Sequence, residues 1–245
     1  MSHLPYTLDV DDPAVPPMGL IVLQTDETIE PEFRRSFSDH ANPLYVSRIR
    51  SGVEVTTDSL SSMAADLRQA ADLLPKARRF GVVGYGCTSA SSVIGSDKVE
   101  DLVRAGCDTA TVTNPLRAAV ACAKDLGISR LALLSPYIEE VTVPLRAAFA
   151  RDGIEMDVFG SFGVAEEAKV VRISNDSVVE AACALGADSA VEGVFISCTN
   201  LRTFEAVKRV QNRIEKPVLS SNQSLAWHMR KLSDAQKSGA QTSVQ

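Results

Sequence analysis

The stretch FGVVGYGCTS (residues 80–89) joins an apolar run to a cysteine and two hydroxyl residues. Short apolar runs are typical of strands in a parallel sheet, because helices cover both faces of such a strand. Segments of helical period separate several such runs, for example PLRAAVACAKDLG (115–127), which begins with proline and stops at glycine. The sequence therefore predicts an α/β protein with strands at 19–24, 44–49, 79–85, 109–113, 130–136, 155–161, 193–198 and 217–221 and further helices at 59–74, 175–187 and 224–236.

The order of these pieces repeats along the chain. A shift of 111 residues places LIVL (20–23) on LALL (131–134) and GYGCTS (84–89) on FISCTN (195–200). The shared offset predicts two pseudo-symmetric lobes, each a short parallel sheet flanked by helices. We expect the first lobe to comprise residues 1–113 plus 218–245, with a returning C-terminal helix, and the second lobe to comprise residues 114–217.

The charge and hydropathy of the chain exclude several classes of partner. Its 245 residues carry a net charge of −6, and Lys and Arg cluster no further than short pairs such as Arg78-Arg79, so the basic surface of a nucleic-acid binder is missing. The N-terminal residues 1–20 lack the basic and apolar regions of a signal peptide, and no apolar run approaches the ~18 residues of a membrane span. We expect a cytoplasmic homo-oligomer that binds a small molecule and neither nucleic acid nor membrane.

Five cysteines, an odd number, indicate free thiols in that compartment rather than a disulfide framework. No group of cysteines and histidines has zinc spacing, so no metal is expected. Cys122 and Cys183 lie in alanine-rich helical segments and Cys107 lies just ahead of a strand, and we interpret all three as structural.

Cys87 and Cys198 follow strands at matching places in the two lobes. Parallel sheets bind ligands beyond the carboxyl ends of their strands, where helix N-termini present N–H groups and lower the pKa of a cysteine. The neighbouring side chains can hold a carboxylate: Thr88, Ser89, Thr199 and Asn200. Either cysteine alone is equally a small buried hydrophobe. Because both occur at one offset, we interpret them as a catalytic pair on opposite faces of one ligand.

Six stretches carry a resemblance to a known family, and its most specific parts are the two Cys-Thr segments and the SSNQ motif with the tryptophan that follows it. They are MGLIVLQTDETIEPEF (18–33), GYGCTSASSVIG (84–95), TNPLRAAVA (113–121), LLSPYIEEVTVPLR (133–146), FISCTNLRTFEAV (195–207) and KPVLSSNQSLAWH (216–228). The chain resembles the maleate cis-trans isomerase and arylmalonate decarboxylase branch of the Asp/Glu racemase superfamily. Within it, the strings VLQTDETIE, GYGCTS, TNPL and SPY are most similar to the ectoine-utilisation protein A group.

The resemblance implies a cofactor-independent enzyme with its site between two lobes. Matched position by position, Cys87 is the nucleophile or base of the first lobe and Cys198 the acid of the second. Decarboxylases of this branch have glycine at the first position, so Cys87 argues against decarboxylation. Tyr137 matches a tyrosine that binds a substrate carboxylate together with Thr88 and Ser89, and the alternative is a buried tyrosine at a strand end.

Two positions depart from the isomerases. Asp26 stands where they carry asparagine, and Glu167 falls near a second substrate-binding asparagine. A carboxylate here repels a second substrate carboxylate by roughly 4 kcal/mol at about 4 Å and an effective dielectric of about 20. We therefore expect a substrate with one carboxylate and one cationic or amide nitrogen, such as ectoine, hydroxyectoine or acetylated diaminobutyrate. The alternative for Asp26 is a helix N-cap.

Three functions stay open at this point. The leading hypothesis is a racemase or isomerase that exchanges a proton next to a carboxylate or amidine through the cysteine pair, with a role in ectoine or hydroxyectoine breakdown. The first alternative is cis-trans isomerisation, in which Cys87 adds to an alkene carbon and Cys198 protonates its neighbour. The second is a small-molecule binding module without catalysis.

Overall fold

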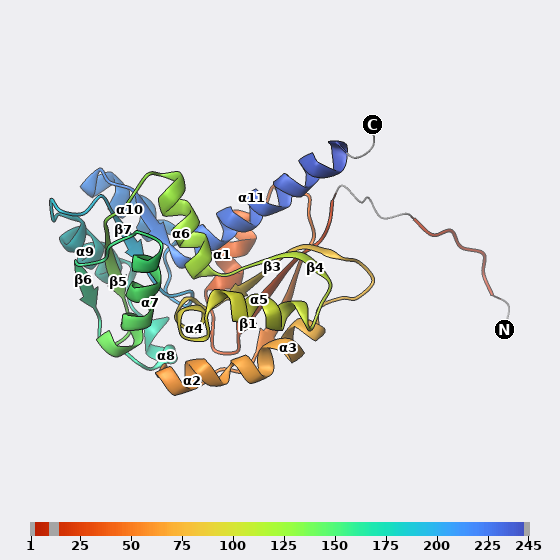
Figure 1. Ribbon diagram of the computed structural model, residues 1–245, viewed down its shortest axis with the longest axis horizontal. Helices are drawn as coiled ribbons and strands as arrows, with labels where there is room; N and C mark the ends of the chain where they lie inside the picture. Colours follow the sequence, from red (N-terminus) through yellow and green to blue (C-terminus); the bar gives the residue numbers. More distant parts are fainter. Residues whose placement is uncertain (1–2, 10–14, 243–245) are drawn as a thin grey trace.

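The computed structural model describes residues 3–9 and 15–242, with side chains to residue 236. The chain forms two four-stranded parallel sheets, one in each lobe (Figure 1). The first sheet has the order β2-β1-β3-β4, with β2 at Leu44–Ile49, β1 at Met18–Leu23, β3 at Phe80–Gly86 and β4 at Thr109–Thr113. The second has the order β6-β5-β7-β8, with β6 at Phe159–Ser161, β5 at Leu131–Ser135, β7 at Gly193–Ile196 and β8 at Val218–Ser220. The predicted α/β fold with two similar lobes is confirmed.

Helices cover both faces of the first sheet. Along β1, Ile21 and Leu23 pack on one face with α3 (Ala64–Asp72) and α5 (Ser96–Arg104). Leu20 and Val22 point to the other face and pack with α1 (Ile29–Ser36) and α11 (Ser221–Thr242). This alternation buries the strand completely, which explains its continuous apolar sequence. Two short helices complete the lobe, α2 (Thr57–Ser62) and α4 (Thr88–Ile94).

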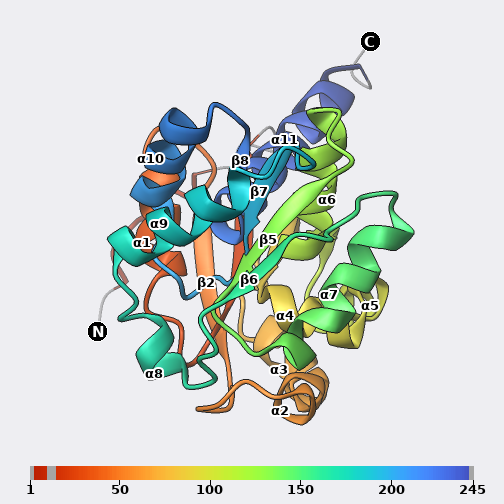
Figure 2. The same cartoon turned by 90° about the vertical axis from the view of Figure 1, so that its left-hand side faces the viewer.

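The second sheet is built in the same way. Leu131 and Leu133 pack with α6 (Pro115–Asp125) and α7 (Glu139–Arg151), whereas Ala132 and Leu134 pack with α9 (Asn175–Gly186) and α10 (Phe204–Ile214). A single-turn helix, α8 (Glu167–Val170), follows β6. Figure 2 shows the central strand β5 between these two layers of helices.

The C-terminal segment differs from the expected division into lobes. Residues 218–220 pair with β7, through Val194 with Val218 and Ile196 with Ser220, so this strand belongs to the second sheet rather than to the first lobe. The chain crosses between the lobes one residue later, because α11 begins at Ser221 and packs against β1 and β3 of the first sheet. The placement of strand 218–220 in the first lobe was wrong, since a three-residue strand carries too little pattern to show which sheet it joins.

Smaller differences concern the ends of elements. The helix expected at 59–74 is divided at Met63 into α2 and α3. Of the strand expected at 155–161, residues 159–161 form a regular ladder with β5, whereas Glu155 forms only an isolated bridge with Arg130. The helix expected at 175–187 ends one residue earlier, at Gly186, and the Ser174 hydroxyl caps its start by accepting the N–H of Ser177. Each of these is a boundary that local sequence defines weakly.

Backbone pairing joins the two lobes beyond the sheets. The loop after β2 forms an antiparallel bridge with the loop after β6, between Glu54 and Glu166. The N–H of Val55 donates to the carbonyl of Ala165 at 3.0 Å, near α2 and α8 at the lower end of Figure 2. These loops occupy equivalent places in the two lobes, so the pairing closes one side of the space between the sheets.

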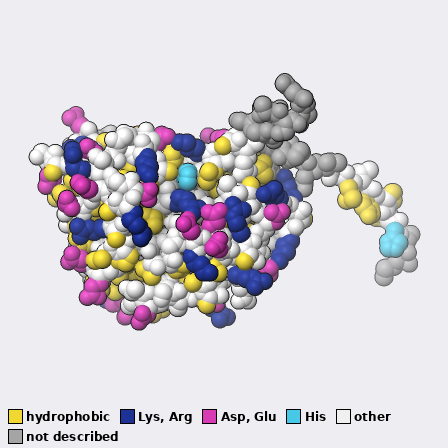
Figure 3. Space-filling view, viewed as in Figure 1, with side chains coloured by type: hydrophobic (Ala, Val, Ile, Leu, Met, Phe, Trp, Pro, Cys, Tyr) yellow, Lys and Arg dark blue, Asp and Glu magenta, His cyan; other side chains and the backbone are white. Residues whose placement is uncertain are grey.

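The surface offers no dominant charge of one sign on the face shown in Figure 3, where acidic and basic side chains are interspersed. Within residues 3–9 and 15–242, no helix combines the length and the apolar character that crossing a membrane requires.

Candidate active site

The carboxyl ends of the two sheets face each other, and hydrogen bonds cross between them. Asn200, after β7, accepts the N–H of Glu27 at 2.9 Å through Oδ1. Its carbonyl accepts the hydroxyl of Thr28 at 2.9 Å, and the Thr199 hydroxyl donates to the carbonyl of Gly86 at 3.2 Å. The loops after β1, β3 and β7 are therefore held against one another at the expected cleft.

Cys87 occupies the N-cap of α4. Its Sγ accepts the N–H of Ala90 at 3.4 Å, and the side chain is 6% exposed. Burial raises the pKa of this thiol to about 12; the N–H groups of Ala90 and Ser89 lower it, while the charges of Glu167 and Asp26 raise it. Cys87 is thus a neutral thiol. The N–H groups that point at its sulfur are placed to stabilise the thiolate form.

Cys198 lies in a turn with strained backbone. Its φ is +124°, a conformation that residues other than glycine rarely adopt and that costs about 1–3 kcal/mol. The N–H donates to the hydroxyl of Ser221 at 3.0 Å, and Sγ lies 3.0 Å from the hydroxyl of Tyr137. Burial, and then the charge of Glu167, raise the pKa of this thiol well above its ordinary value.

Tyr137 connects Cys198 to Glu167. The tyrosine hydroxyl donates to Oε1 of Glu167 at 2.6 Å, and Oε2 of the same carboxylate accepts Nδ2 of Asn200 at 2.7 Å. Because the single phenolic proton goes to the carboxylate, the Cys198 thiol donates to the tyrosine oxygen. Cys198 therefore holds its proton in a directed hydrogen bond, as a general acid requires.

The two carboxylate oxygens of Asp26 differ in their hydrogen bonds. Oδ1 accepts the N–H groups of Thr28 and Ile29, both at 2.8 Å, so this oxygen binds the start of α1, although the N-cap residue is Thr28 rather than Asp26. Oδ2 is buried and has no hydrogen-bond partner among the described residues. Burial raises the pKa of this carboxyl above its ordinary value of 3.8, although the two N–H groups, the Thr199 side chain and the positive charge of Arg48 each lower it. A buried carboxylate oxygen without a donor is a position for a ligand donor.

Arg48 holds the loop that carries Asp26. Its Nη1 donates to the carbonyls of Leu23 at 2.9 Å, Gln24 at 3.2 Å and Asp26 at 3.1 Å, and its Nη2 pairs with Glu30. These contacts hold Arg48 against the loop, and its charge lowers the pKa of Asp26.

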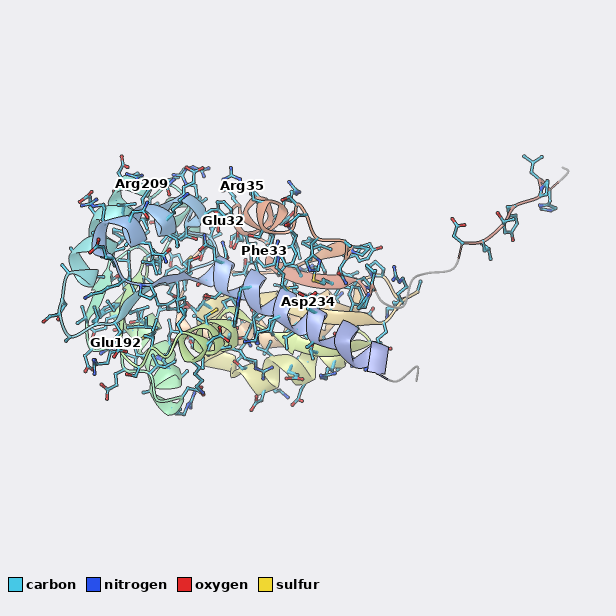
Figure 4. The ribbon with its side chains drawn as sticks, turned by 90° about the horizontal axis from the view of Figure 1, so that it is seen from above. Glu32, Phe33, Arg35, Glu192, Arg209 and Asp234 are labelled. Carbon is cyan, nitrogen blue, oxygen red and sulfur yellow. The ribbon has the colours of Figure 1, made fainter. Side chains whose placement is uncertain are left out.

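Three residues that sequence reasoning did not assign complete the surroundings. Ser221 contacts both cysteine turns, since its hydroxyl also lies 2.7 Å from that of Thr88. Glu32, labelled on α1 in Figure 4, accepts the N–H groups of Thr203 at 2.7 Å and Phe204 at 2.9 Å at the start of α10. Asn222 donates to Glu32 at 2.8 Å and to the carbonyl of Thr199 at 2.8 Å. The SSNQ motif was the available signal for Ser221 and Asn222, whereas nothing in the sequence marked Glu32.

The structure brings the nine predicted site residues into one buried region. None is more than 6% exposed: Asp26, Cys87, Thr88, Ser89, Tyr137, Glu167, Cys198, Thr199 and Asn200. These side chains have almost no access to solvent, so a ligand could reach them only if the lobes or their connecting loops moved. In the part of the chain that the structure describes, no three His, Cys, Asp or Glu side chains group as a metal site.

Two like lobes, with a cysteine at the end of an equivalent strand in each, define a class of two-lobed α/β enzymes that act through cysteine. The arylmalonate decarboxylase family model matches residues 18–244, and the chain belongs to this family. The family comprises cysteine-dependent isomerases and decarboxylases that act on carboxylates.

Similar proteins include members with each activity. An arylmalonate decarboxylase from Bordetella bronchiseptica is 30% identical over 118 residues, which is 47% of this chain and 46% of that protein. A maleate isomerase from Alcaligenes faecalis is 23% identical over 228 residues, 87% of this chain and 89% of that protein. Among solved structures, the maleate isomerase Iso from Pseudomonas putida S16 has a TM-score of 0.78 at 22% identity, covering 89% of this chain and 92% of that one.

A cysteine-to-serine mutant of a Nocardia farcinica maleate cis-trans isomerase, with a covalently bound succinylcysteine intermediate, has a TM-score of 0.78 at 23% identity and covers 89% of this chain and 93% of that one.

Proposed function

We propose that the protein is a cis-trans isomerase of a small unsaturated carboxylate that also carries a cationic or amide nitrogen. The Cys87 thiol loses its proton to water as the substrate binds, and the resulting thiolate adds to one alkene carbon while the Cys198 proton goes to the other. Rotation about the resulting single bond follows. The reverse step breaks the sulfur–carbon bond and returns the proton to Cys198, so no redox partner is needed.

The difference between the two thiols carries this proposal. Cys87 accepts backbone N–H groups at a helix start, which stabilise a thiolate, whereas Cys198 donates its proton to Tyr137. One residue is thus arranged as the nucleophile and the other as the acid. The succinylcysteine in the Nocardia farcinica isomerase is an adduct of the kind that this mechanism forms.

The carboxylate of the substrate is expected near Thr88 and Ser89, at the first turn of α4. Both side chains are buried beside Cys87, and helix N-termini favour anions. Negative charge that develops on this group after addition would be stabilised by the same donors.

The nitrogen is expected against Asp26 and Glu167. The free Oδ2 of Asp26 can accept one N–H, and the charges of both carboxylates raise the pKa of both thiols. A cationic group placed here would cancel that effect and lower the pKa of Cys87, so the substrate itself would promote formation of the nucleophile. A second carboxylate would have the opposite effect.

Proton exchange by the two thiols at a saturated carbon is the second candidate, and the matched positions of the cysteines favour it. The resemblance to the ectoine-utilisation group suggests ectoine, hydroxyectoine and acetylated diaminobutyrate as its substrates. These compounds also combine one carboxylate with at least one cationic or amide nitrogen.

NMR in D₂O tests both candidates with one panel: maleate, maleamate, both ectoine enantiomers, hydroxyectoine and acetylated diaminobutyrate. Isomerisation converts maleamate to its trans isomer, whereas proton exchange places deuterium on the α-carbon of a recovered saturated substrate. Cys87→Ala and Cys198→Ala should each abolish turnover, and Cys107→Ala is the matched control. Turnover of no compound, or turnover that survives both active-site substitutions, would reject a cysteine-pair isomerase.

A further inference from the structure

Ser221 stands where the chain crosses from the second lobe to the first. It directly follows β8 and begins α11, and its side chain is fully buried. Its Oγ lies 3.0 Å from the N–H of Cys198 and 2.7 Å from Oγ1 of Thr88, which follows Cys87 in the chain. One hydroxyl therefore contacts the turn of each cysteine.

Counting protons shows which way these hydrogen bonds run. The N–H of Cys198 can only donate, so the Ser221 oxygen accepts there. The hydroxyls of Ser221 and Thr88 carry one proton each, and one of these two protons forms the hydrogen bond between them. Among the described residues, no other acceptor is found for either hydroxyl proton. One of the two protons is consequently left for a group that enters the site, and an oxyanion is the acceptor that benefits most.

We propose that Ser221 is a positioning residue for both halves of the reaction. It fixes the strained Cys198 turn by accepting its N–H, and it donates to Oγ1 of Thr88, so that the Thr88 proton is directed to the substrate oxyanion. This inference rests on the proposed function, because the oxyanion is the one formed after Cys87 adds to the substrate. Ser221 itself need not touch the substrate.

The kinetic signature follows from when the oxyanion forms. An interaction that strengthens only as charge develops raises kcat more than it changes KM. Ser221→Ala should therefore lower kcat for the best substrate of the panel by about 10–100-fold, with KM changed less than about threefold. Ser224→Ala is the matched control, because Ser224 lies in the same helix, is 2% exposed and has its side chain beside Cys122 rather than at either active-site cysteine turn. Its kcat should equal that of the wild type.

A double-mutant cycle separates positioning from simple loss of packing. If Ser221 acts through Thr88, then Ser221→Ala should cost much less in a Thr88→Val background than in the wild type. Effects that multiply, or a KM change as large as the kcat change, would overturn the proposal. Ser221→Thr, which keeps the hydroxyl, should retain most of the wild-type kcat, and Ser221→Gly, which lacks it, replaces the alanine variant in the cycle if that variant does not fold.

Alkylation distinguishes a failure of this inference from a failure of the proposed function. If the wild type turns over no compound, the proposed function fails, and mass spectrometry of iodoacetamide-treated protein still tests the link between the turns. Ser221→Ala should change the alkylation rates of both Cys87 and Cys198 and leave those of Cys107 and Cys183 unchanged. A change at neither active-site cysteine, or at all four, would show that Ser221 does not couple the two turns.

Discussion

Replacing Asp26 with asparagine tests the most unusual feature of the site, its unpartnered carboxylate oxygen. A unit charge about 4 Å away, at an effective dielectric of about 20, contributes about 4 kcal/mol, which corresponds to about a thousandfold in affinity. Maleamate and maleate differ only in whether one end is an amide or a carboxylate. We expect the wild type to prefer maleamate, and Asp26→Asn to reduce that preference, measured as the ratio of kcat/KM values, by at least about tenfold.

The fold should tolerate this substitution. Asparagine keeps an oxygen for the N–H groups of Thr28 and Ile29. Because the folded state raises the pKa of Asp26 above 3.8, ionisation of this group costs stability at pH 7 and costs nothing below pH 3.8. The variant should therefore have an equal or higher free energy of unfolding at pH 7. Asp26→Ala instead leaves two N–H groups unpaired, at about 1–3 kcal/mol each.

Glu27→Gln provides the matched control, since it removes the same charge from the next residue, which pairs on the surface with Arg172 at 3.1 Å. Steady-state kinetics with both substrates and urea unfolding give the two readouts. A maleamate-to-maleate ratio within about twofold of the wild type would refute the assignment of Asp26 to the substrate nitrogen.

Three further predictions concern stability and thiol reactivity. Glu32→Gln places an amide N–H against Nδ2 of Asn222, so the free energy of unfolding should fall by about 1–3 kcal/mol. The control Glu205→Gln, at an exposed residue, should change it little, and equal free energies of unfolding for the two variants would contradict the role of Glu32 between the lobes. Burial lowers the pKa of His228 from 6.5 to about 4, so the free energy of unfolding should decline as the pH falls through that interval. His228→Gln should flatten the decline, and parallel pH profiles of the free energy of unfolding for the wild type and the variant would count against this prediction. With a pKa of about 12, Cys87 should react with iodoacetamide more slowly than the half-buried Cys107 at pH 8 and speed up with rising pH, and rapid modification of Cys87 at pH 7 would show a thiolate at rest.

The sequence predicted the sheets well because buried strands and repeated turns leave local signals. The strands at 44–49 and 109–113 have the bounds expected, since the first directly follows Pro43 and the second directly precedes Asn114. The strand at 218–220 was assigned to the wrong lobe because its pairing with β7 is a long-range choice that three residues do not encode. A boundary between two like lobes is therefore harder to locate than the elements that form them.

The same distinction holds for the site. Cys87, Cys198 and their neighbours could be found because they follow strands at one offset. Glu32 and Ser221 could not be assigned, since they act through partners far along the chain: Glu32 binds the N–H of Thr203, and Ser221 binds that of Cys198. Such contacts depend on how the lobes meet rather than on local pattern. Asp26 was a mixed case, because one oxygen accepts N–H groups at the start of α1 and the other has no hydrogen-bond partner among the described residues.

The symmetry of the backbone and the asymmetry of the side chains together bear on the reaction. A racemase must take a proton from either face, so each of its thiols alternates between acid and base and needs comparable surroundings. Here the equivalent strand ends carry unlike groups: Asp26 follows β1, whereas Tyr137 follows β5 and binds Cys198. Only the second cysteine has a hydroxyl and a carboxylate aligned behind its proton. An arrangement with one fixed acid and one fixed nucleophile suits addition to an alkene better than exchange between mirror-image substrates.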